Sequence, residues 1–234
     1  MIWLPAGLAL SLLVACGGPK DPVQKLTREL DNFPEFSLIV DDTRIEGTLF
    51  HDYALRFQVL TASSQRVAGR DTLVYEDRRT DWYPVKENIY YRYENYVGMV
   101  VASKSLDGHR TGANQAHPPG YQHVGNPQYG SWGAGGFWQF YGQYALMSHM
   151  MGGWRVGRGD WADYRRTSGR GRPYYGPVQG GKPTFGSQGS VTQKTRPKFY
   201  QRQQSRRQAF GSKVNNRMGR TTSGWGRGAS RSGK

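Results

Sequence analysis

The charged residues of this chain are sorted along its length, and this segregation limits what the chain can fold into. Residues 1–110 hold 13 Lys and Arg against 15 Asp and Glu, residues 111–154 hold no charged side chain, and residues 155–234 hold 19 against two. A block with such an excess of one sign is typical of an interaction tail. We therefore expect the fold to lie in the first half, and the net charge of +15 to belong to the end of the chain.

The chain begins with an uncharged, mostly apolar run that is shorter than the roughly 20 residues needed to cross a bilayer. We interpret residues 1–15 as a signal peptide. The run ends in Leu13-Val14-Ala15-Cys16, followed by two glycines. These four residues resemble the lipobox of bacterial lipoproteins, although no Lys or Arg precedes the apolar run as that family normally has. An ordinary secretory signal with a chance cysteine is the alternative.

The resemblance implies that Cys16 carries a diacylglycerol group and becomes the mature N-terminus, with residues 16–19 as a lipidated tether. It implies a protein anchored in the cell envelope, at the outer membrane facing the periplasm, or on the exterior of the cell membrane where there is no outer membrane. Cys16 is the only cysteine. No disulfide can therefore form within the chain, and the fold must rely on packing.

Residues 20–108 are predicted to form a small α+β domain in which one N-terminal helix packs on an antiparallel sheet. Asp21 can cap the helix and Pro22 can occupy its first position, and the apolar residues that follow recur at intervals of three and four as far as Phe33. Residues 53–61 alternate, which suits a sheet with one buried face. The predicted strands cover residues 36–41, 53–61, 72–76, 89–94 and 96–103.

The middle of the chain is uncharged and changes character near residue 137. Residues 109–136 are rich in Gly and Pro and are predicted to be a linker. Residues 137–151 are predicted to form a short apolar helix rich in aromatic residues and Met. Such a helix can contact a membrane interface, self-associate or pack on the α+β domain. The candidate contacts are Phe137, Trp138, Phe140, Tyr141 and Tyr144.

Residues 152–234 are predicted to form a largely disordered Gly/Arg-rich tail, because they offer few apolar groups to offset chain entropy. Basic side chains near a negative surface favour anionic partners, here anionic lipids, lipopolysaccharide or wall polymers. Aromatic residues among the arginines would also suit single-stranded nucleic acid, which the lipobox makes an unlikely partner. The candidate anion-binding residues are Arg165, Arg166, Arg170, Arg172, Arg206 and Arg207.

The sequence contains no recognised catalytic or metal-binding pattern. The spacing of His109, His117, His123 and His149 matches no common metal site. Neither a Gly-x-Ser-x-Gly nor a phosphate-loop pattern occurs. We therefore expect a protein that is not an enzyme and that uses no metal or cofactor.

The order of parts also resembles YgiB-type bacterial lipoproteins, with a lipid signal, a segment that ends in Met150-Met151-Gly152-Gly153 and a Ser/Arg/Gly tail. The first half departs from that layout, because it is strand-rich and lacks cysteine pairs. The resemblance implies an envelope role.

The sequence thus favours a non-enzymatic envelope lipoprotein with a basic tail for anionic polymers or lipids. Two alternatives stay open: a docking module for another envelope protein, formed by residues 20–108, and a nucleic-acid-binding protein, if the signal is misread. The oligomeric state is not specified.

Overall fold

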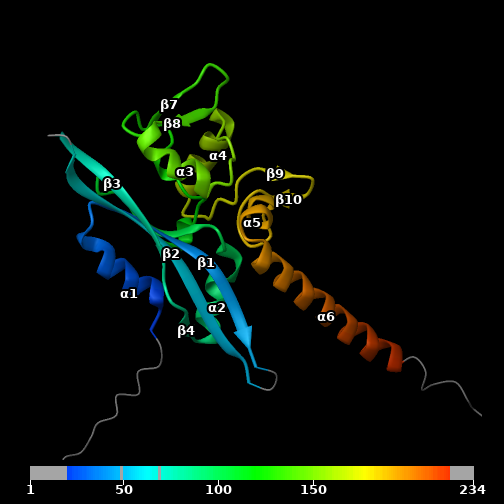
Figure 1. The fold of residues 1–234 in the computed structure, drawn as a ribbon. Coiled ribbons are helices and arrows are strands. Elements are labelled where there is room, and N and C mark those ends of the chain that lie inside the picture. Colours follow the sequence, from blue (N-terminus) through cyan, green and yellow to red (C-terminus); the bar gives the residue numbers. More distant parts are fainter. Residues whose placement is uncertain (1–19, 48–49, 68–69, 222–234) are drawn as a thin grey trace, which may run out of the picture.

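A computed structural model describes residues 20–47, 50–67 and 70–221. An antiparallel sheet forms the centre, with helices on its faces and one long helix at the C-terminal end (Figure 1). The predicted α+β class is therefore confirmed. The strands are β1 Glu35–Glu46, β2 Asp52–Val67, β3 Arg70–Arg79, β4 Tyr83–Val85, β5 Val100–Lys104, β6 Arg110–Thr111, β7 Gly130–Trp132, β8 Trp138–Phe140, β9 Val178–Gln179 and β10 Lys182–Pro183. The helices are α1 Pro22–Glu29, α2 Glu87–Tyr93, α3 Ala145–Met150, α4 Arg158–Ser168, α5 Ser190–Thr195 and α6 Pro197–Thr221.

Helix α1 forms where the sequence predicted the N-terminal helix. The Asp21 carboxylate accepts a hydrogen bond from the Val23 amide at 3.0 Å, which satisfies one of the free donors of the first turn. The same carboxylate accepts from the Tyr93 hydroxyl at 2.9 Å and from Arg92 at 3.0 Å, so the cap also fastens α1 to α2. Leu26 and Leu30 face the core, and the helix ends ahead of Pro34.

The main sheet has the order β3-β2-β1-β5-β6, and β4 pairs with β2. Pairing of Leu38 with Val59, and of Val40 with Phe57, puts these four side chains on one buried face. The other face is covered too. Leu60, which points the opposite way from Val59, packs with buried aromatic and Met side chains of the second half of the chain. The expectation of a sheet with a single buried face is therefore wrong.

Two predicted strands take other forms. Residues 89–94 lie mostly in helix α2, because Ile89, Tyr90 and Tyr93 are spaced to bury one helical face. The strand predicted over 96–103 begins only at Val100, after a turn in which Gly98 adopts a φ of +82°. The other three predicted strands are confirmed, and each is longer than the sequence suggested.

The second half of the chain packs on the sheet, which corrects the predictions for residues 109–136 and 137–151. Residues 109–136 are not a linker, because Ala116, Tyr121 and Tyr129 are fully buried. Residues 137–151 are not one helix: β8 pairs with β7 as a hairpin, and α3 begins only at residue 145. Turn glycines between Trp132 and Phe137 permit this hairpin, and Gly136 has a φ of +74°.

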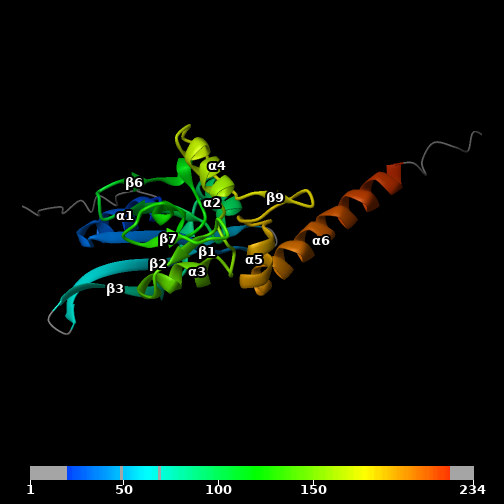
Figure 2. The ribbon, with the colours of Figure 1, turned by 90° about the horizontal axis from the view of Figure 1, so that it is seen from above.

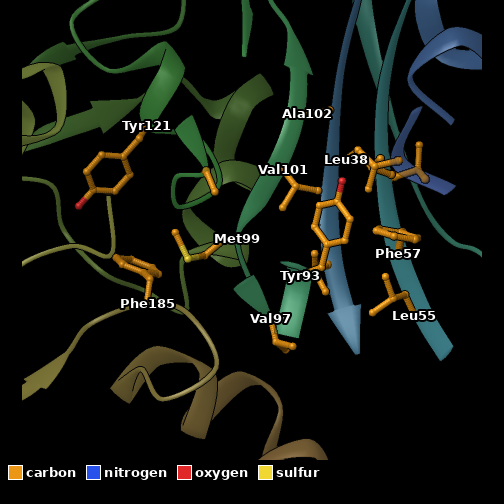
Figure 3. Packing of buried hydrophobic residues seen from close by; sticks show 14 of the residues in the cluster. Leu38, Leu55, Phe57, Tyr93, Val97, Met99, Val101, Ala102, Tyr121 and Phe185 are labelled. Carbon is orange, nitrogen blue, oxygen red and sulfur yellow. The ribbon is translucent and has the colours of Figure 1, made fainter. Parts of the chain in front are cut away.

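The predicted disordered tail also differs from the structure over residues 152–209. Widely spaced apolar side chains from these residues are buried in the core. Because the residues between them are mostly Gly, Arg, Ser and Pro, the sequence did not indicate this burial. These side chains are Val156, Tyr164, Tyr174, Phe185, Val191 and Phe199. Figure 3 shows Tyr121 and Phe185 beside Met99, on the side of it away from the strands that carry Leu38 and Phe57. The core is thus continuous across residue 108, where the sequence predicted a domain boundary. Residues 1–19 and 222–234 lie outside the described residues.

Candidate functional site

The structure divides the predicted anion-binding arginines between two surfaces. Arg165 and Arg166 lie in the last turn of α4, and Arg170 and Arg172 follow in the turn after it, all exposed. Arg206 and Arg207 lie on α6, which projects from the body in both views (Figures 1 and 2). The two groups are therefore separate surfaces, where the sequence suggested one continuous tail.

Helix α6 is the more basic of the two elements. It contains seven Lys and Arg and no Asp or Glu over 25 residues. At 1.5 Å per residue it is about 37 Å long. No helix of the described residues, α6 included, is both long enough and apolar enough to cross a bilayer.

Arginines at the start of α6 and just before it attach this part of the chain to the sheet. Arg202 Nη2 lies 2.6 Å from both carboxylate oxygens of Asp42. Arg196, between α5 and α6, donates to the Asp41 carbonyl at 3.0 Å and lies 3.5 Å from the Asp41 carboxylate. Burial lowers the pKa of the Arg196 guanidinium, and the charge of Asp41 opposes this shift. Arg206 donates to the Ile45 carbonyl at 2.8 Å. Arg206 thus has a structural contact, whereas Arg207 is exposed and makes no ion pair within the described part of the chain.

Helix α4 and the β7–β8 hairpin together form an arginine and aromatic surface. Arg158 lies over the Trp132 ring at 4.5 Å, and Arg165 lies over the Trp161 ring at 5.0 Å. The centroids of Trp132 and Trp161 are 5.9 Å apart in an edge-to-face arrangement. The Gly157 amide donates to the Asp160 carboxylate at 3.2 Å, which stabilises the first turn of α4. Helix α4 therefore begins at Arg158, one of the arginines of this surface.

A recess of about 490 Å³ lies beside this surface. Trp161 and Arg165 form part of its wall, together with His123 and Tyr129. The recess is within the size range of small-molecule sites. Its wall is mostly polar, with hydroxyl and amide side chains contributed by Ser105, Ser168, Gln115, Gln122, Asn126 and Gln128.

Glu35 and His123 form a buried polar centre behind this wall. Both are 1% exposed, and His123 Nε2 lies 3.1 Å from Glu35 Oε1. This distance is short enough for a hydrogen bond, but the angles are unsuitable. Neither ring nitrogen of His123 has a hydrogen-bond partner among the described residues. The second oxygen of Glu35 accepts from the Tyr129 hydroxyl at 2.6 Å and from Tyr75 at 3.2 Å. Burial, together with Glu35, raises the pKa of both tyrosines well above the usual range. The centre thus joins β1, β3 and residues 121–129 by neutral donors.

His117 makes a second buried link between the same segment and the sheet. Its Nδ1 lies 3.0 Å from the Gln115 carbonyl and its Nε2 lies 2.9 Å from Gln122 Oε1. The Gln122 amide in turn donates to the Ser37 hydroxyl at 2.8 Å. Burial lowers the pKa of His117 to about 4, so the ring is neutral at ordinary pH.

The aromatic residues predicted to contact a membrane are not a common surface. Trp138 and Tyr144 are buried, Phe140 is half-buried, and Phe137 and Tyr141 are exposed. Each of the two buried rings contacts a different cluster: Trp138 packs in the main core and Tyr144 packs with Leu60. The hypothesis of a membrane or self-association contact by all five residues is therefore wrong.

Two further predictions concern lipid and metal. Cys16, the predicted lipid attachment residue, lies outside the described residues. Among residues 20–47, 50–67 and 70–221, no three His, Cys, Asp or Glu side chains converge as a metal site would require.

The sequence interpretation missed Arg155, Arg158, Arg196 and Glu35. The first two carried a usable signal, because basic residues occur at positions 155, 158 and 165, close to Trp161. The Glu35 centre had none, since its partners lie 40 to 94 positions away in the chain. Comparison of the chain with protein-family models, with curated proteins and with solved structures found no match.

Proposed function

We propose that this chain is a non-enzymatic lipoprotein of the cell envelope, anchored through Cys16, whose basic C-terminal part contacts anionic envelope lipids or polymers. The observation that carries the proposal is helix α6, with seven basic residues, no acid and a direction away from the body (Figure 1). Lipid at one end and a projecting cationic helix at the other give a protein two attachments, each of which is weak alone.

Only some of the basic residues of α6 contact the sheet, which supports an electrostatic role for the others. Arg202 and Arg206 use their guanidinium groups to dock the helix on β1. Arg207, the next basic residue of α6, is exposed and makes no ion pair within the described residues, and Lys213, Arg217 and Arg220 follow it in the sequence. Each basic group near an anionic surface contributes about 1 kcal/mol before screening by salt. Four such residues can therefore control binding.

The charge of α6 is tested by replacing Arg207, Lys213, Arg217 and Arg220 with Gln. Binding of the full chain to vesicles that contain phosphatidylglycerol should weaken at least tenfold, because about 1 kcal/mol is lost per residue. The control replaces Arg78, Lys86, Lys182 and Lys194, which are exposed, and removes the same total charge. Equal losses in the two variants would contradict a specific role for α6.

The lipid anchor needs a separate test. Globomycin, which blocks the peptidase that cleaves ahead of a lipidated cysteine, should cause a larger precursor to accumulate in expressing cells. Mass spectrometry of the mature protein should find an acylated Cys16 at its N-terminus. A mature chain that keeps Met1 would contradict the anchor and would favour the nucleic-acid alternative.

A further inference from the structure

The surface of α4 and the β7–β8 hairpin contains three arginines whose guanidinium groups lie on aromatic rings. Arg155 lies over Phe137 at 4.4 Å, in addition to Arg158 over Trp132 and Arg165 over Trp161. All three arginines are exposed. Residues 158, 161 and 165 recur at intervals of three and four, so they share one face of α4. We name Arg158, Trp132, Trp161 and Arg165 the arginine–tryptophan ladder.

No carboxylate neutralises the ladder within the part of the chain that the structure describes. The only two acids after residue 154 are Asp160 and Asp163. Asp160 accepts from the Gly157 amide at the start of α4, and Asp163 pairs with Arg166. Neither ladder arginine forms an ion pair within the described residues, unlike Arg196 and Arg202, which contact Asp41 and Asp42. One further carboxylate, Asp107, lines the recess beside Arg165 without pairing with it.

The rings beneath them also restrict the two arginines, whose guanidinium carbons lie 4.5 Å and 5.0 Å from the ring centroids. An arginine held against a ring loses less side-chain freedom when it binds, and its planar fork keeps five N–H donors. Such groups match phosphate oxygens in a bidentate geometry. The Cα atoms of Arg158 and Arg165, seven residues apart on a helix, are about 10 Å apart. This separation allows each arginine to take a different phosphate of one chain.

The surface is poorly suited to nucleic-acid bases. Base stacking needs a free ring face. Trp161 is covered by Arg165, and it also packs on the backbone at Gly125, where an added Cβ would lie only 2.5 Å from the ring. The recess beside Arg165, of about 490 Å³, instead leaves room for the unit that carries the phosphate.

From this geometry we infer that the arginine–tryptophan ladder is a preorganised binding site for the phosphate groups of a soluble, phosphate-bearing polymer. The inference deepens the proposed function and rests on it for the class of partner. It assigns the phosphate contacts to α4, whereas the contact with the membrane belongs to α6. Phosphates in lipid headgroups share the same chemistry and are the alternative source.

The test measures binding of inorganic polyphosphate to the full chain at fixed salt. The double variant Arg158→Gln/Arg165→Gln should lose at least about tenfold in affinity, since hydrogen bonds between charged groups are stronger than neutral ones. The control Arg170→Gln/Arg172→Gln removes the same charge from the turn that follows α4, outside the ladder. It should lose less than about threefold, as expected for exposed charges. Equal losses in the two variants would overturn the inference.

Two further variants keep the result interpretable. Arg158→Lys/Arg165→Lys preserves the charge but not the planar fork, and it should also lose affinity; unchanged binding would overturn the bidentate geometry. The four-residue variant of α6 should keep its polyphosphate binding while it loses vesicle binding. If the ladder variant loses vesicle binding but not polyphosphate binding, the soluble polymer is excluded. Failure of both ladder and α6 variants to alter any binding would instead contradict the proposed function.

Discussion

Two regions of the second half of the chain are held on the sheet by different chemistry. Residues 109–189 attach through aromatic packing and uncharged donors, as in the bonds from Tyr129 to Glu35 and from Gln122 to Ser37. The segment formed by α5 and α6 also buries Val191 and Phe199, but its polar attachment is made by arginines, which contact Asp41, Asp42 and the Ile45 carbonyl. The first attachment should depend on the protonation of a buried histidine, and the second on complete pairing of two aspartates.

The largest expected effect comes from Asp41→Asn. The Asp41 side chain is 5% exposed and lies within 3.5 Å of Arg56, Arg79 and Arg196. Neutralising it leaves Arg196 largely buried beside uncompensated positive charge, which costs about 3–5 kcal/mol of folding stability. Urea unfolding of the full chain measures this loss. Asp163→Asn, which breaks an exposed pair with Arg166, is the control and should cost less than about 1 kcal/mol. If Asp41→Asn and Asp163→Asn cost similar amounts of stability, the attachment of α5 and α6 does not depend on the pairing of Asp41.

The pH dependence of stability should reveal the other attachment. His117 is fully buried with its pKa lowered to about 4, whereas an unfolded histidine has a pKa near 6.5. Between these values the unfolded chain binds a proton that the native chain does not, so stability falls as the pH drops from about 6.5 to about 4, by a total of about 3 kcal/mol.

His117→Gln should remove this contribution to the pH slope, because glutamine does not titrate. The exposed His109→Gln is the matched control and should leave the slope as it is. A slope that survives His117→Gln unchanged would assign the pH dependence to other groups. Stability is to be measured by urea unfolding at several pH values in the same salt.

The packing of the first region is tested by Gly125→Ala. Gly125 has a φ of +85°, and an added Cβ would lie 2.5 Å from Trp161. Backbone strain costs about 1 kcal/mol and overpacking adds about 1–2 kcal/mol, so the loss should be about 2–3 kcal/mol. Gly136→Ala is a matched control, because its φ is +74° and nothing lies within 4 Å. Gly136→Ala should lower the stability only by the cost of backbone strain, about 1 kcal/mol. An equal loss in the two variants would mean that Trp161 is free to move.

The sequence predicted the first half of the fold from local patterns. Asp21, Pro22 and the apolar spacing after them determine α1, and the alternation over residues 53–61 determines β2. Such patterns report on neighbours in the chain. They failed at residues 89–93, where three tyrosines and one isoleucine favoured a strand but the buried face has helical spacing.

The second half could not be predicted in the same way, because its order depends on distant partners. Tyr174 and Phe185 are isolated in a run of Gly, Arg and Pro, and only contact with Tyr121 shows that they belong to the core. The basic candidates were correctly recognised as exposed at Arg165 and Arg207. The sequence could not separate them from Arg196 and Arg202, whose aspartate partners lie 155 and 160 positions earlier.

The smallest predicted effect concerns the edge of β1. Beyond Val40, this edge pairs with no other strand among the described residues, and Arg196 and Arg206 donate to the carbonyls of Asp41 and Ile45 there. Arg206→Gln should cost about 0.5 kcal/mol, since one exposed hydrogen bond is lost. Arg207→Gln, one position later, should cost nothing measurable. An open strand edge invites pairing with other chains, so Arg206→Gln should also raise the concentration-dependent light scattering of the protein. If Arg207→Gln raises it equally, net charge and not edge protection explains the effect.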